Sequence, residues 1–321
     1  MASIHSLPNY RIAVVGSGAM GCYYGGKLAA GGRDVHFLMR SDYEHVKKHG
    51  LRICTKGGDF RLQGVKCYRE TEDIGPVDLV LIALKTTSNE ALKELIPPLL
   101  HENTMLLTLQ NGLGNEEFLA ENFGAHRIMG GLCFVCINRT APGEIVHIGE
   151  GRIGLGEYDP GDGTGGAPKE RTHEVCWELE RCGIVCSVVE NLATERWRKL
   201  VWNIPFNGLS IVACGIDTSR ILENAELLAL TRQLMHETIG IAEKLGHDIP
   251  MSFAEKMIDV TGPMGEYRPS SLIDFLEGRE VEVEPIWGEP YRRGLKAGAD
   301  VGRLQTLYRL LKHQVATRAT G

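Results

Sequence analysis

The 321-residue chain contains no run of about 18 consecutive apolar residues, the length that a membrane-spanning helix requires. It also has no excess of basic residues, because 35 Lys and Arg stand against 41 Asp and Glu, for a formal net charge of −6. Anionic lipid and the phosphodiester backbone both attract basic surfaces. We therefore expect no membrane span and no nucleic-acid partner.

The chain also lacks the marks of a secreted protein. Nothing resembling a signal peptide precedes Tyr10, and the nine cysteines, an odd number, show no framework spacing. This pattern predicts reduced thiols in the cytoplasm. Cys133 and Cys136 form one CxxC, but apolar residues separate them and no second ligand pair accompanies them for zinc. We expect core packing there and no metal site.

What the chain does contain is enough apolar sequence, 43%, for a sizeable core, and a length that suits two domains at ~100–200 residues each. Short apolar runs alternate with helical stretches in the first part, which predicts an α/β domain with a parallel sheet covered by helices. The expected strands are Arg11–Val15, Val35–Leu38, Asp78–Leu84, Met105–Leu109 and Ile128–Cys136.

The pattern changes further along the chain. After the turn at Pro142-Gly143, we predict a hairpin of Glu144–Ile148 with Arg152–Gly156, then a helix over Lys169–Arg181 and a strand over Ile184–Val189. From Asn191 onward helical periodicity dominates. We therefore predict an α/β domain over residues 1–190 and a mostly α-helical domain over residues 191–321.

A glycine-rich loop follows the first expected strand directly and opens a helix, a context in which GxGxxG predicts dinucleotide binding. The first glycine permits the tight turn, the second lets a pyrophosphate approach the backbone, and the third lets the helix pack on the strand. Free N–H groups and the helix dipole supply affinity for an anion. The loop consists of Gly16, Ser17, Gly18, Ala19, Met20 and Gly21.

Residue 40 bears on the choice of dinucleotide. Folds that prefer NAD place an acidic residue at the end of the second strand, whereas this sequence has Arg40 there, and a guanidinium fits the 2′-phosphate of NADP. The alternative is an ordinary exposed arginine. We interpret the nearby Asp42 as part of a capping box, Ser41 to Glu44, at the start of a helix.

Two more polar residues follow strand ends. Lys85 comes after Asp78–Leu84, and Asn111 follows Met105–Leu109 and Gln110. Ligands of open α/β sheets bind beyond the carboxyl ends of the strands, so both positions suit a contact with cofactor, and Asn111 also suits a place between nicotinamide and substrate. For each, the alternative is an ordinary loop residue chosen for turn formation, and for Lys85 the two readings are even.

A helix expected over Glu195–Asn207 carries Lys199, Asn203 and Asn207 within about 80° of its circumference. Hydride reduction of a ketone leaves an alkoxide, which an ammonium can stabilise and then protonate, while carboxamides orient the substrate. The alternative is a solvated helix face. Pro205 predicts a kink beside this polar stripe.

A second group of polar residues lies near the end of the chain. Ser270 suits a helix N-terminus and Gly278 the end of that helix. An acidic group beyond it can hold Lys199 protonated, can accept a hydrogen bond from a substrate hydroxyl, or can simply form the wet face of an extended segment. The residues alone leave these three readings open. The acidic residues, alternating with valines, are Glu280, Glu282 and Glu284.

Together these motifs resemble the ketopantoate reductase family. The resemblance implies a Rossmann-type dinucleotide-binding domain followed by a helical substrate domain, NADPH as hydride donor, and a 2-keto acid in the interdomain cleft. It implies the reduction of 2-dehydropantoate to (R)-pantoate, on the route to pantothenate and coenzyme A, and a homodimer. The matching segments are Gly16–Gly25, Gln110-Asn111-Gly112, Pro142–Gly149 (PGEIVHIG), Trp197–Asn207 (WxKLxxNxxxN) and Ser270–Glu282.

The resemblance also implies roles for individual residues. Lys199 would be the proton donor and Glu282 the residue that binds the substrate hydroxyl. Arg40 and Lys85 fall where the family contacts the adenosine phosphate and the cofactor. The residues that would hold the substrate are Asn111, Asn203, Asn207 and Ser270.

Three positions concern the substrate. Asp217 and Trp287 depart from the family pattern, and Arg268 suits either a carboxylate contact or the surface. Since pocket contacts set the discrimination between related acids, a reductase of a different 2-keto acid is the first alternative. The second, from another class, is a non-catalytic NADPH-sensing regulator, against which the full polar set argues because a sensor needs no proton donor.

Overall fold

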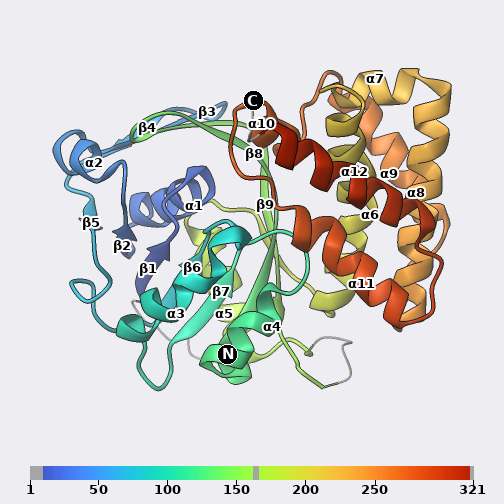
Figure 1. Cartoon of the computed structure of the whole chain (residues 1–321). Helices are drawn as coiled ribbons and strands as arrows, with labels where there is room; N and C mark the ends of the chain where they lie inside the picture. The colour runs from blue at the N-terminus through green and yellow to red at the C-terminus, as the bar shows by residue number, and fades with distance from the viewer. Residues whose placement is uncertain (1–9, 162–165, 319–321) are drawn as a thin grey trace, which may run out of the picture. The chain divides into compact units, whose positions relative to one another are not determined.

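The computed structural model describes residues 10–161 and 166–318, which fall into two compact units. Of these residues, the first unit comprises 10–110, 115–160 and 166–192, and the second comprises 111–114, 161 and 193–318. Figure 1 shows the strands of the first unit in blue to green and most helices of the second in yellow to red. Within the described ranges, no helix combines the length and apolarity needed to cross a membrane.

The first unit is built on a sheet whose described strands follow the order β4-β3-β9-β8-β7-β6-β1-β2-β5, with β10 paired to β9. At its centre β1 (Arg11–Val15) lies parallel to β2 (Asp34–Leu38) on one side and to β6 (Leu79–Ile82) on the other. The chain thus winds outward from β1 in both directions, which confirms the predicted α/β fold. The other strands are β3 Leu51–Thr55, β4 Phe60–Leu62, β5 Lys66–Tyr68, β7 Met105–Thr108, β8 Ile128–Ala141, β9 Glu144–Glu157 and β10 Cys186–Val188.

Alternate residues of β1 enter two different cores. Ile12 and Val14 pack in a cluster with residues of α1 and α5, whereas Ala13 and Val15 pack in a cluster with residues of α3 and α4. Helices therefore cover both faces of the central strands, as their unbroken apolar sequence requires. The helices of this unit are α1 Ala19–Ala30, α2 Tyr43–His49, α3 Leu92–Leu95, α4 Asn115–Phe123 and α5 Glu170–Arg181, with 3-10 turns at Thr86–Ala91, Pro97–Leu99 and Ala125–Arg127.

The predicted hairpin after Pro142-Gly143 is wrong. Residues 144–157 form one strand, β9, and its antiparallel partner is β8, which continues past the predicted end at Cys136 to Ala141. The segment Gly149-Glu150-Gly151 does not reverse the chain but shifts the register, so that Phe134 pairs with Arg152 and Val135 with Glu150. Glu150, at φ 61, and the glycines on either side of it form a β-bulge here.

The predicted capping box at Ser41 to Glu44 is also wrong. Helix α2 begins at Tyr43, Asp42 is its N-cap residue, and no side chain bonds the first turn. The Asp42 carboxylate instead accepts hydrogen bonds from Arg139 Nη1 at 3.0 Å and from the backbone N–H of Gly143 at 3.1 Å. Because the Asp42 carboxylate bonds the β8–β9 turn, it does not cap the first turn of α2.

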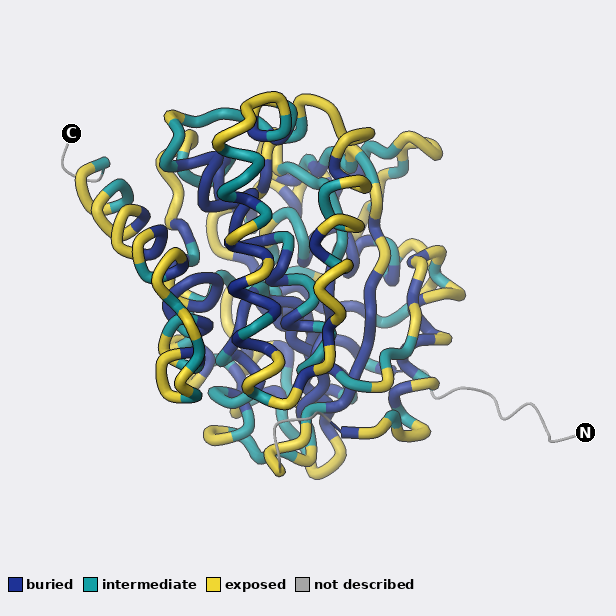
Figure 2. Tube along the Cα trace, turned by 90° about the vertical axis from the view of Figure 1, so that its right-hand side faces the viewer, coloured by how far each residue is buried: buried dark blue, intermediate teal, exposed yellow. Residues whose placement is uncertain are grey.

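In the described residues of the second unit every regular element is helical, as the periodicity after Asn191 predicts. Helix α6 (Leu192–Val212) contains the predicted helix and continues past Pro205. Figure 2, in which these helices face the viewer, shows buried and exposed residues alternating along them, as amphipathic helices require. The others are α7 Thr218–Glu223, α8 Ala225–Lys244, α9 Ser252–Thr261, α10 Ser270–Leu276, α11 Glu289–Lys296 and α12 Gly302–Arg318, with a 3-10 turn at Gly262–Met264 and a π-helix at Glu284–Gly288.

Candidate functional site

The glycines of the loop after β1 are required for different reasons. Gly16 has φ 102, and a Cβ there would lie 2.3 Å from the backbone nitrogen of Leu84, while a Cβ on Gly21 would lie 2.2 Å from the Gly16 carbonyl oxygen. The fold itself therefore demands these two glycines. Gly18 has φ −78, and no atom lies within 4 Å of where its Cβ would be. Its surroundings tolerate a side chain, so a ligand that approaches the backbone is the reason that fits a glycine there.

Helix α1 starts at this loop with its first N–H groups uncapped by any side chain. Gly18 is the exposed N-cap residue, and Ala19 and Met20 form the half-buried first turn. The Ser17 hydroxyl donates a 2.7 Å hydrogen bond to the Leu38 carbonyl and so ties the loop to the end of β2. The arrangement fits an anion at the helix N-terminus.

Arg40 lies just beyond the same end of β2 and is exposed to solvent. Asp42, the acidic residue nearby, is buried and bonded to the β8–β9 turn. Of Arg40 and Asp42, the residue exposed at this strand end is therefore the cation. Lys85 is half-buried and is the N-cap residue of the 3-10 turn that follows β6.

Gln110, which the sequence singles out only as part of the segment Gln110-Asn111-Gly112, is a structural residue of this edge. Its amide nitrogen donates to the Leu84 carbonyl at 3.0 Å and to Asn89 Oδ1 at 2.7 Å, and its oxygen accepts from the Thr108 hydroxyl at 3.0 Å. The buried amide thus joins the ends of β6 and β7. A buried primary amide must satisfy several hydrogen bonds, and its place directly after an apolar strand was the available signal.

In the second unit Lys199 lies against Asn111. Lys199 Nζ donates a 2.8 Å hydrogen bond to Asn111 Oδ1, and both side chains are half-buried. Asn111 follows β7 in sequence, yet residues Asn111–Gly114 belong to the second unit. This hydrogen bond fixes the position of the lysine amine relative to the Asn111 carboxamide.

The polar stripe of α6 is more buried than a solvated helix face would be. Asn203 is 9% exposed and Asn207 is 2% exposed. Asn207 Oδ1 accepts a 3.0 Å hydrogen bond from the backbone N–H of Ser271, in the first turn of α10. Asn207 therefore holds the N-terminus of α10 beside α6, and Ser270, exposed, begins that helix.

The alternating acidic segment follows α10. Val281 and Val283 are buried, Glu280 and Glu284 are exposed and Glu282 is half-buried, which matches the predicted alternation of acidic residues with valines. Glu284 also opens the π-helix.

Glu284 is tied to the last two helices. Its carboxylate accepts from Arg292 Nη1 and from the Tyr308 hydroxyl, each at 2.7 Å. Burial opposes ionisation of Glu284, but the hydrogen bonds and charges of Arg292 and its neighbours outweigh it and lower the pKa of this carboxyl. Glu284 is therefore an ionised structural group.

The family model described as ketopantoate reductase PanE/ApbA matches residues 12–160, and the model of its C-terminal part matches residues 191–315. The chain belongs to the ketopantoate reductase family. It is 41% identical over 311 residues to the 2-dehydropantoate 2-reductase of Nostoc sp., covering 97% of each chain.

Two solved structures of ketopantoate reductases agree with this membership. The 2-dehydropantoate 2-reductase from Geobacter metallireducens has 45% identity and a TM-score of 0.90, with 94% of this chain and 99% of that chain covered. The enzyme of that name from Methylococcus capsulatus has 33% identity and a TM-score of 0.87, with 96% and 97% covered. The fold of this ketopantoate reductase family member is therefore shared along nearly the whole chain.

The two departures from the ketopantoate reductase pattern have structural roles. Asp217 is the N-cap residue of α7, where its carboxylate accepts from the backbone N–H of Arg220 at 3.1 Å and from the Ser219 hydroxyl at 2.7 Å. Burial opposes these hydrogen bonds, but they prevail and lower the pKa of Asp217. Trp287 is fully buried, and its indole N–H donates to the Ile204 carbonyl at 2.9 Å. Asp217 therefore caps a helix, and Trp287 packs in the core of the second unit.

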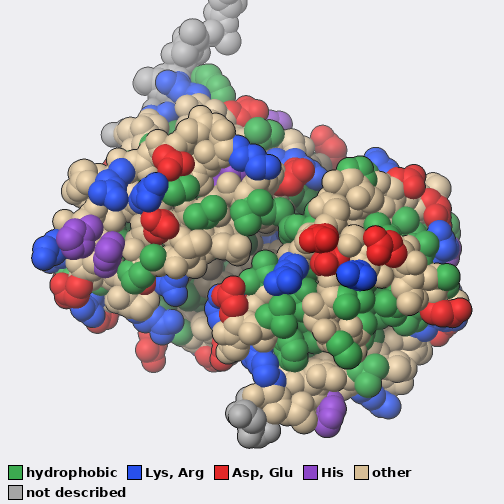
Figure 3. Space-filling view, turned by 90° about the horizontal axis from the view of Figure 1, so that it is seen from above, with side chains coloured by type: hydrophobic (Ala, Val, Ile, Leu, Met, Phe, Trp, Pro, Cys, Tyr) green, Lys and Arg blue, Asp and Glu red, His purple; other side chains and the backbone are tan. Residues whose placement is uncertain are grey.

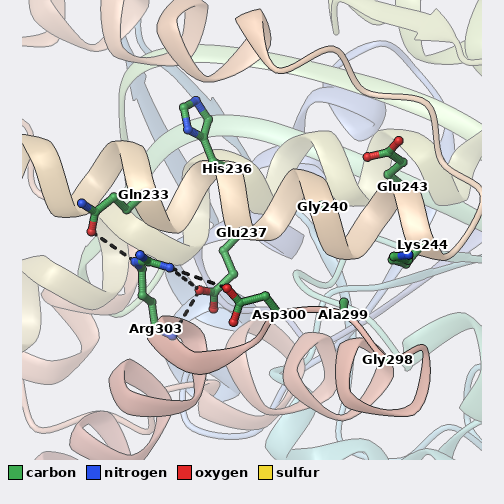
Figure 4. Close-up of a pocket in the computed structure, with 10 residues that line it drawn as sticks. All are labelled: Gln233, His236, Glu237, Gly240, Glu243, Lys244, Gly298, Ala299, Asp300 and Arg303. Carbon is green, nitrogen blue, oxygen red and sulfur yellow. Dashed lines mark hydrogen bonds and ion pairs between the residues drawn. The ribbon is translucent and has the colours of Figure 1, made fainter.

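A pocket in the second unit lies apart from the predicted site residues. Figure 4 shows it between α8 and the loop before α12, with Arg303 reaching both Gln233 and Glu237. The buried Glu237 carboxylate accepts from the backbone N–H of Leu304 at 2.7 Å and so caps α12. The pocket lining consists of Gln233, His236, Glu237, Gly240, Glu243, Lys244, Gly298, Ala299, Asp300 and Arg303.

Three features bear on metal binding, charged partners and disulfides. The described residues contain no group of three or more His, Cys, Asp or Glu that could hold a metal ion. On the face that Figure 3 shows, Lys and Arg side chains are interspersed with Asp and Glu. All nine cysteines are free thiols.

Proposed function

We propose that the protein is an NADPH-dependent oxidoreductase that reduces 2-dehydropantoate to (R)-pantoate. The observation that carries this proposal is the ammonium of Lys199, held 2.8 Å from Asn111 on the helix that also carries Asn203 and Asn207. Relatives with 41% and 45% identity that bear the name 2-dehydropantoate 2-reductase support the choice of substrate.

We assign cofactor binding to residues 1–190 and substrate binding to residues 191–321. Asn111 is the residue of the first range that we also assign to the substrate. The open space beside Gly18 and the uncapped start of α1 fit a pyrophosphate at Gly16–Gly21. The exposed guanidinium of Arg40 fits a 2′-phosphate, which favours NADPH over NADH. Lys85 would add a further cofactor contact. When bound, NADPH supplies the hydride.

The remaining residues would manage the proton and the substrate. As hydride reaches the carbonyl carbon, Lys199 stabilises the developing charge on oxygen and then donates its proton, an effect typically worth ~10²–10⁴ in rate. Asn111 would orient the Lys199 ammonium toward the substrate oxygen through the hydrogen bond between the two side chains. Glu282 would accept a hydrogen bond from the substrate hydroxyl. Residues Asn203, Asn207 and Ser270 would orient the acid.

NADPH oxidation in the presence of 2-dehydropantoate tests this proposal. We expect turnover by the parent and a ~10²–10⁴-fold lower kcat for Lys199→Ala, with the Kd for NADPH unchanged, because only the proton donor is lost. Lys244→Ala, which removes an exposed lysine from α8, is the matched control and should behave as the parent. Equal rates for Lys199→Ala and the control would contradict the role of Lys199.

A second candidate is the reduction of a 2-keto acid with a bulkier apolar group, which an aromatic cluster around Trp202 of α6 favours. Trp202 lies three residues after Lys199 and is half-buried. Its ring centroid is 5.0 Å from that of Phe206 and 6.2 Å from that of Tyr267, and its indole N–H donates to the Thr261 hydroxyl at 2.9 Å. These contacts hold the ring in one orientation, as a specific apolar wall requires.

A panel of 2-keto acids, compared by kcat/KM with NADPH, separates the candidates. The highest value for 2-dehydropantoate would remove the second candidate. Turnover of any panel member at an enzyme-like rate would exclude the non-catalytic regulator.

We also propose a cytoplasmic location, which the nine free thiols support. A homodimer is supported by family membership alone, and light scattering after size exclusion tests it.

A further inference from the structure

The short segment Asn111–Gly114 is held within the second unit by more than the Lys199 contact. Leu113 is 6% exposed and packs in the second unit's core with Ile286 and Trp287. Gly112 has φ 82, and a Cβ there would lie 2.4–2.6 Å from the carbonyl oxygen, carbonyl carbon and Cβ of Pro285. The backbone of residue 112 thus lies as close to Pro285 as a residue without a side chain allows.

One hydrogen bond fixes this docking, and its acceptor is available because of a proline. In the π-helix, the backbone N–H of Glu289 bonds the Glu284 carbonyl. The next donor in that register would be residue 290, but Pro290 has no N–H. The Pro285 carbonyl is therefore left without a donor in its own helix, and the backbone N–H of Leu113 bonds it at 2.9 Å.

The π-helix thus provides the binding surface for the segment Asn111–Gly114. The carbonyl that its register leaves open is the one against which Gly112 is pressed. Buried carbonyl groups require a partner, so the hydrogen bond from Leu113 is strongly preferred over an undocked loop. Asn111 directly precedes Gly112 and Leu113, so the contacts of these two residues with Pro285 also fix the position of Asn111.

We propose that Gly112 is a positioning residue, which acts through the Pro285 carbonyl to set Asn111 opposite Lys199. The inference rests on the proposed function, because it assigns the docking a role in orienting the proton donor. A Cβ at residue 112 must push the loop away from Pro285, and the Asn111 side chain moves with it. A displacement of about 1 Å in a reacting group can cost ~10²-fold in rate.

Gly114 provides the matched control in the same loop. Its φ is 92, so alanine there meets the same backbone strain as at residue 112. However, the nearest atom to a Cβ on Gly114 is Glu289 Cγ at 3.9 Å, an ordinary contact distance. A difference between the two substitutions therefore reports the contact with Pro285 and not the left-handed backbone.

The test compares Gly112→Ala and Gly114→Ala in the full chain with NADPH and 2-dehydropantoate. We expect Gly112→Ala to lower kcat by ~10- to 100-fold with the Kd for NADPH within about twofold of the parent, and Gly114→Ala to stay within about threefold of the parent. In the Asn111→Ala background, Gly112→Ala should add little, because its effect passes through Asn111. Losses that multiply, or equal losses at residues 112 and 114, would overturn the inference.

A second readout does not depend on turnover. In protein labelled with 13C-lysine, the Cε signal of Lys199, assigned by its disappearance in Lys199→Arg, should shift in Gly112→Ala as it does in Asn111→Ala, and stay in place in Gly114→Ala. An unmoved signal in Gly112→Ala would overturn the positioning role. The same shift in a protein that reduces no 2-keto acid would instead contradict the proposed function and leave the positioning role standing.

Pro290→Ala gives the same information if Gly112→Ala does not fold. It restores an N–H at residue 290 that competes for the Pro285 carbonyl, without touching the loop. We expect a Lys199 signal shifted in the same direction and a smaller loss of kcat. A parent-like signal and parent-like kcat would overturn the inference.

Discussion

Lys199 and Asn111, 88 residues apart in the sequence, are joined by a 2.8 Å hydrogen bond from the lysine ammonium to the carboxamide oxygen. Asn111→Asp places a carboxylate at this distance, and an opposite charge favours the protonated lysine. We expect the alkaline limb of the pH profile of kcat to move to higher pH. Asn224→Asp, which replaces the N-cap residue of α8 with an equally good cap, should leave the profile unchanged. Identical profiles for the two variants would contradict the pairing of Lys199 with Asn111 in the working enzyme.

Arg40 should decide between the two nicotinamide cofactors. Arg40→Ala removes a charged hydrogen-bond donor, so we expect NADPH binding to weaken by ~1–3 kcal/mol and NADH binding to remain as in the parent. Fluorescence titration with each cofactor measures both constants. Arg61→Ala, which removes an exposed arginine from β4, is the control. A similar loss for both cofactors would count against a contact with the 2′-phosphate.

Gly18 and Gly16 should separate cofactor binding from folding. Gly18→Ala meets open space at an allowed φ, so we expect the free energy of unfolding to change by less than about 0.5 kcal/mol while NADPH affinity falls. Gly16→Ala meets the Leu84 backbone at 2.3 Å and should lower stability as well. Urea unfolding and NADPH titration of each variant test this contrast. Parent-like NADPH binding by Gly18→Ala would show that no ligand approaches the loop there.

Asn207 should contribute to stability as well as to substrate binding. Asn207→Ala leaves the buried N–H of Ser271 without its acceptor, and we expect a loss of ~1–3 kcal/mol in the free energy of unfolding. Asn207→Asp keeps an acceptor oxygen and most of the stability, but its charge should raise KM for a carboxylate substrate. Unfolding curves and steady-state kinetics distinguish the two effects. A parent-like KM for Asn207→Asp would remove Asn207 from the substrate site.

Glu157 should make stability depend on acid pH. Burial raises the pKa of this fully buried carboxyl, but hydrogen bonds from Arg171 at 2.9 Å and Thr172 at 2.7 Å, with the charges of Arg171 and Lys169, outweigh burial and lower it. The pKa is therefore lower in the folded than in the unfolded state. The stabilisation is present at neutral pH and is lost as pH falls below about 4.3 toward the folded-state pKa.

Glu157→Ala tests this dependence by urea unfolding from pH 7 down to about pH 2.5, a range that extends well below the unfolded-state pKa of about 4.3. We expect a loss at neutral pH of at most ~3–5 kcal/mol, the cost of breaking a fully buried pair, because the Arg171 side chain keeps 23% exposure. The difference from the parent should shrink as the pH falls. Glu170→Ala, on the exposed side of α5, is the control, and a difference that stays constant with pH would contradict the role of ionisation.

Much of the fold could be predicted because its signals are local. The strands around β1 show as unbroken apolar runs since helices cover both of their faces, and the 3.6-residue period of α6 needs only the spacing of its own residues. The two errors arose where a tertiary contact overrode a local signal. Gly149-Glu150-Gly151 reads as a turn until β8 pairs across it, and Asp42 reads as part of a cap until Arg139 and Gly143 bind it.

The sequence by itself determined the parallel sheet, the glycine loop at its centre and the polar stripe of α6, because the period of a strand or helix and the missing side chain of glycine act within a few residues. Only the tertiary structure decided that Asn111 meets Lys199, that Asn207 holds α10 and that the Pro285 carbonyl receives Leu113. These hydrogen bonds join residues 64 to 172 positions apart, from Asn207–Ser271 to Leu113–Pro285. Their geometry follows from how whole helices pack, which no local pattern encodes.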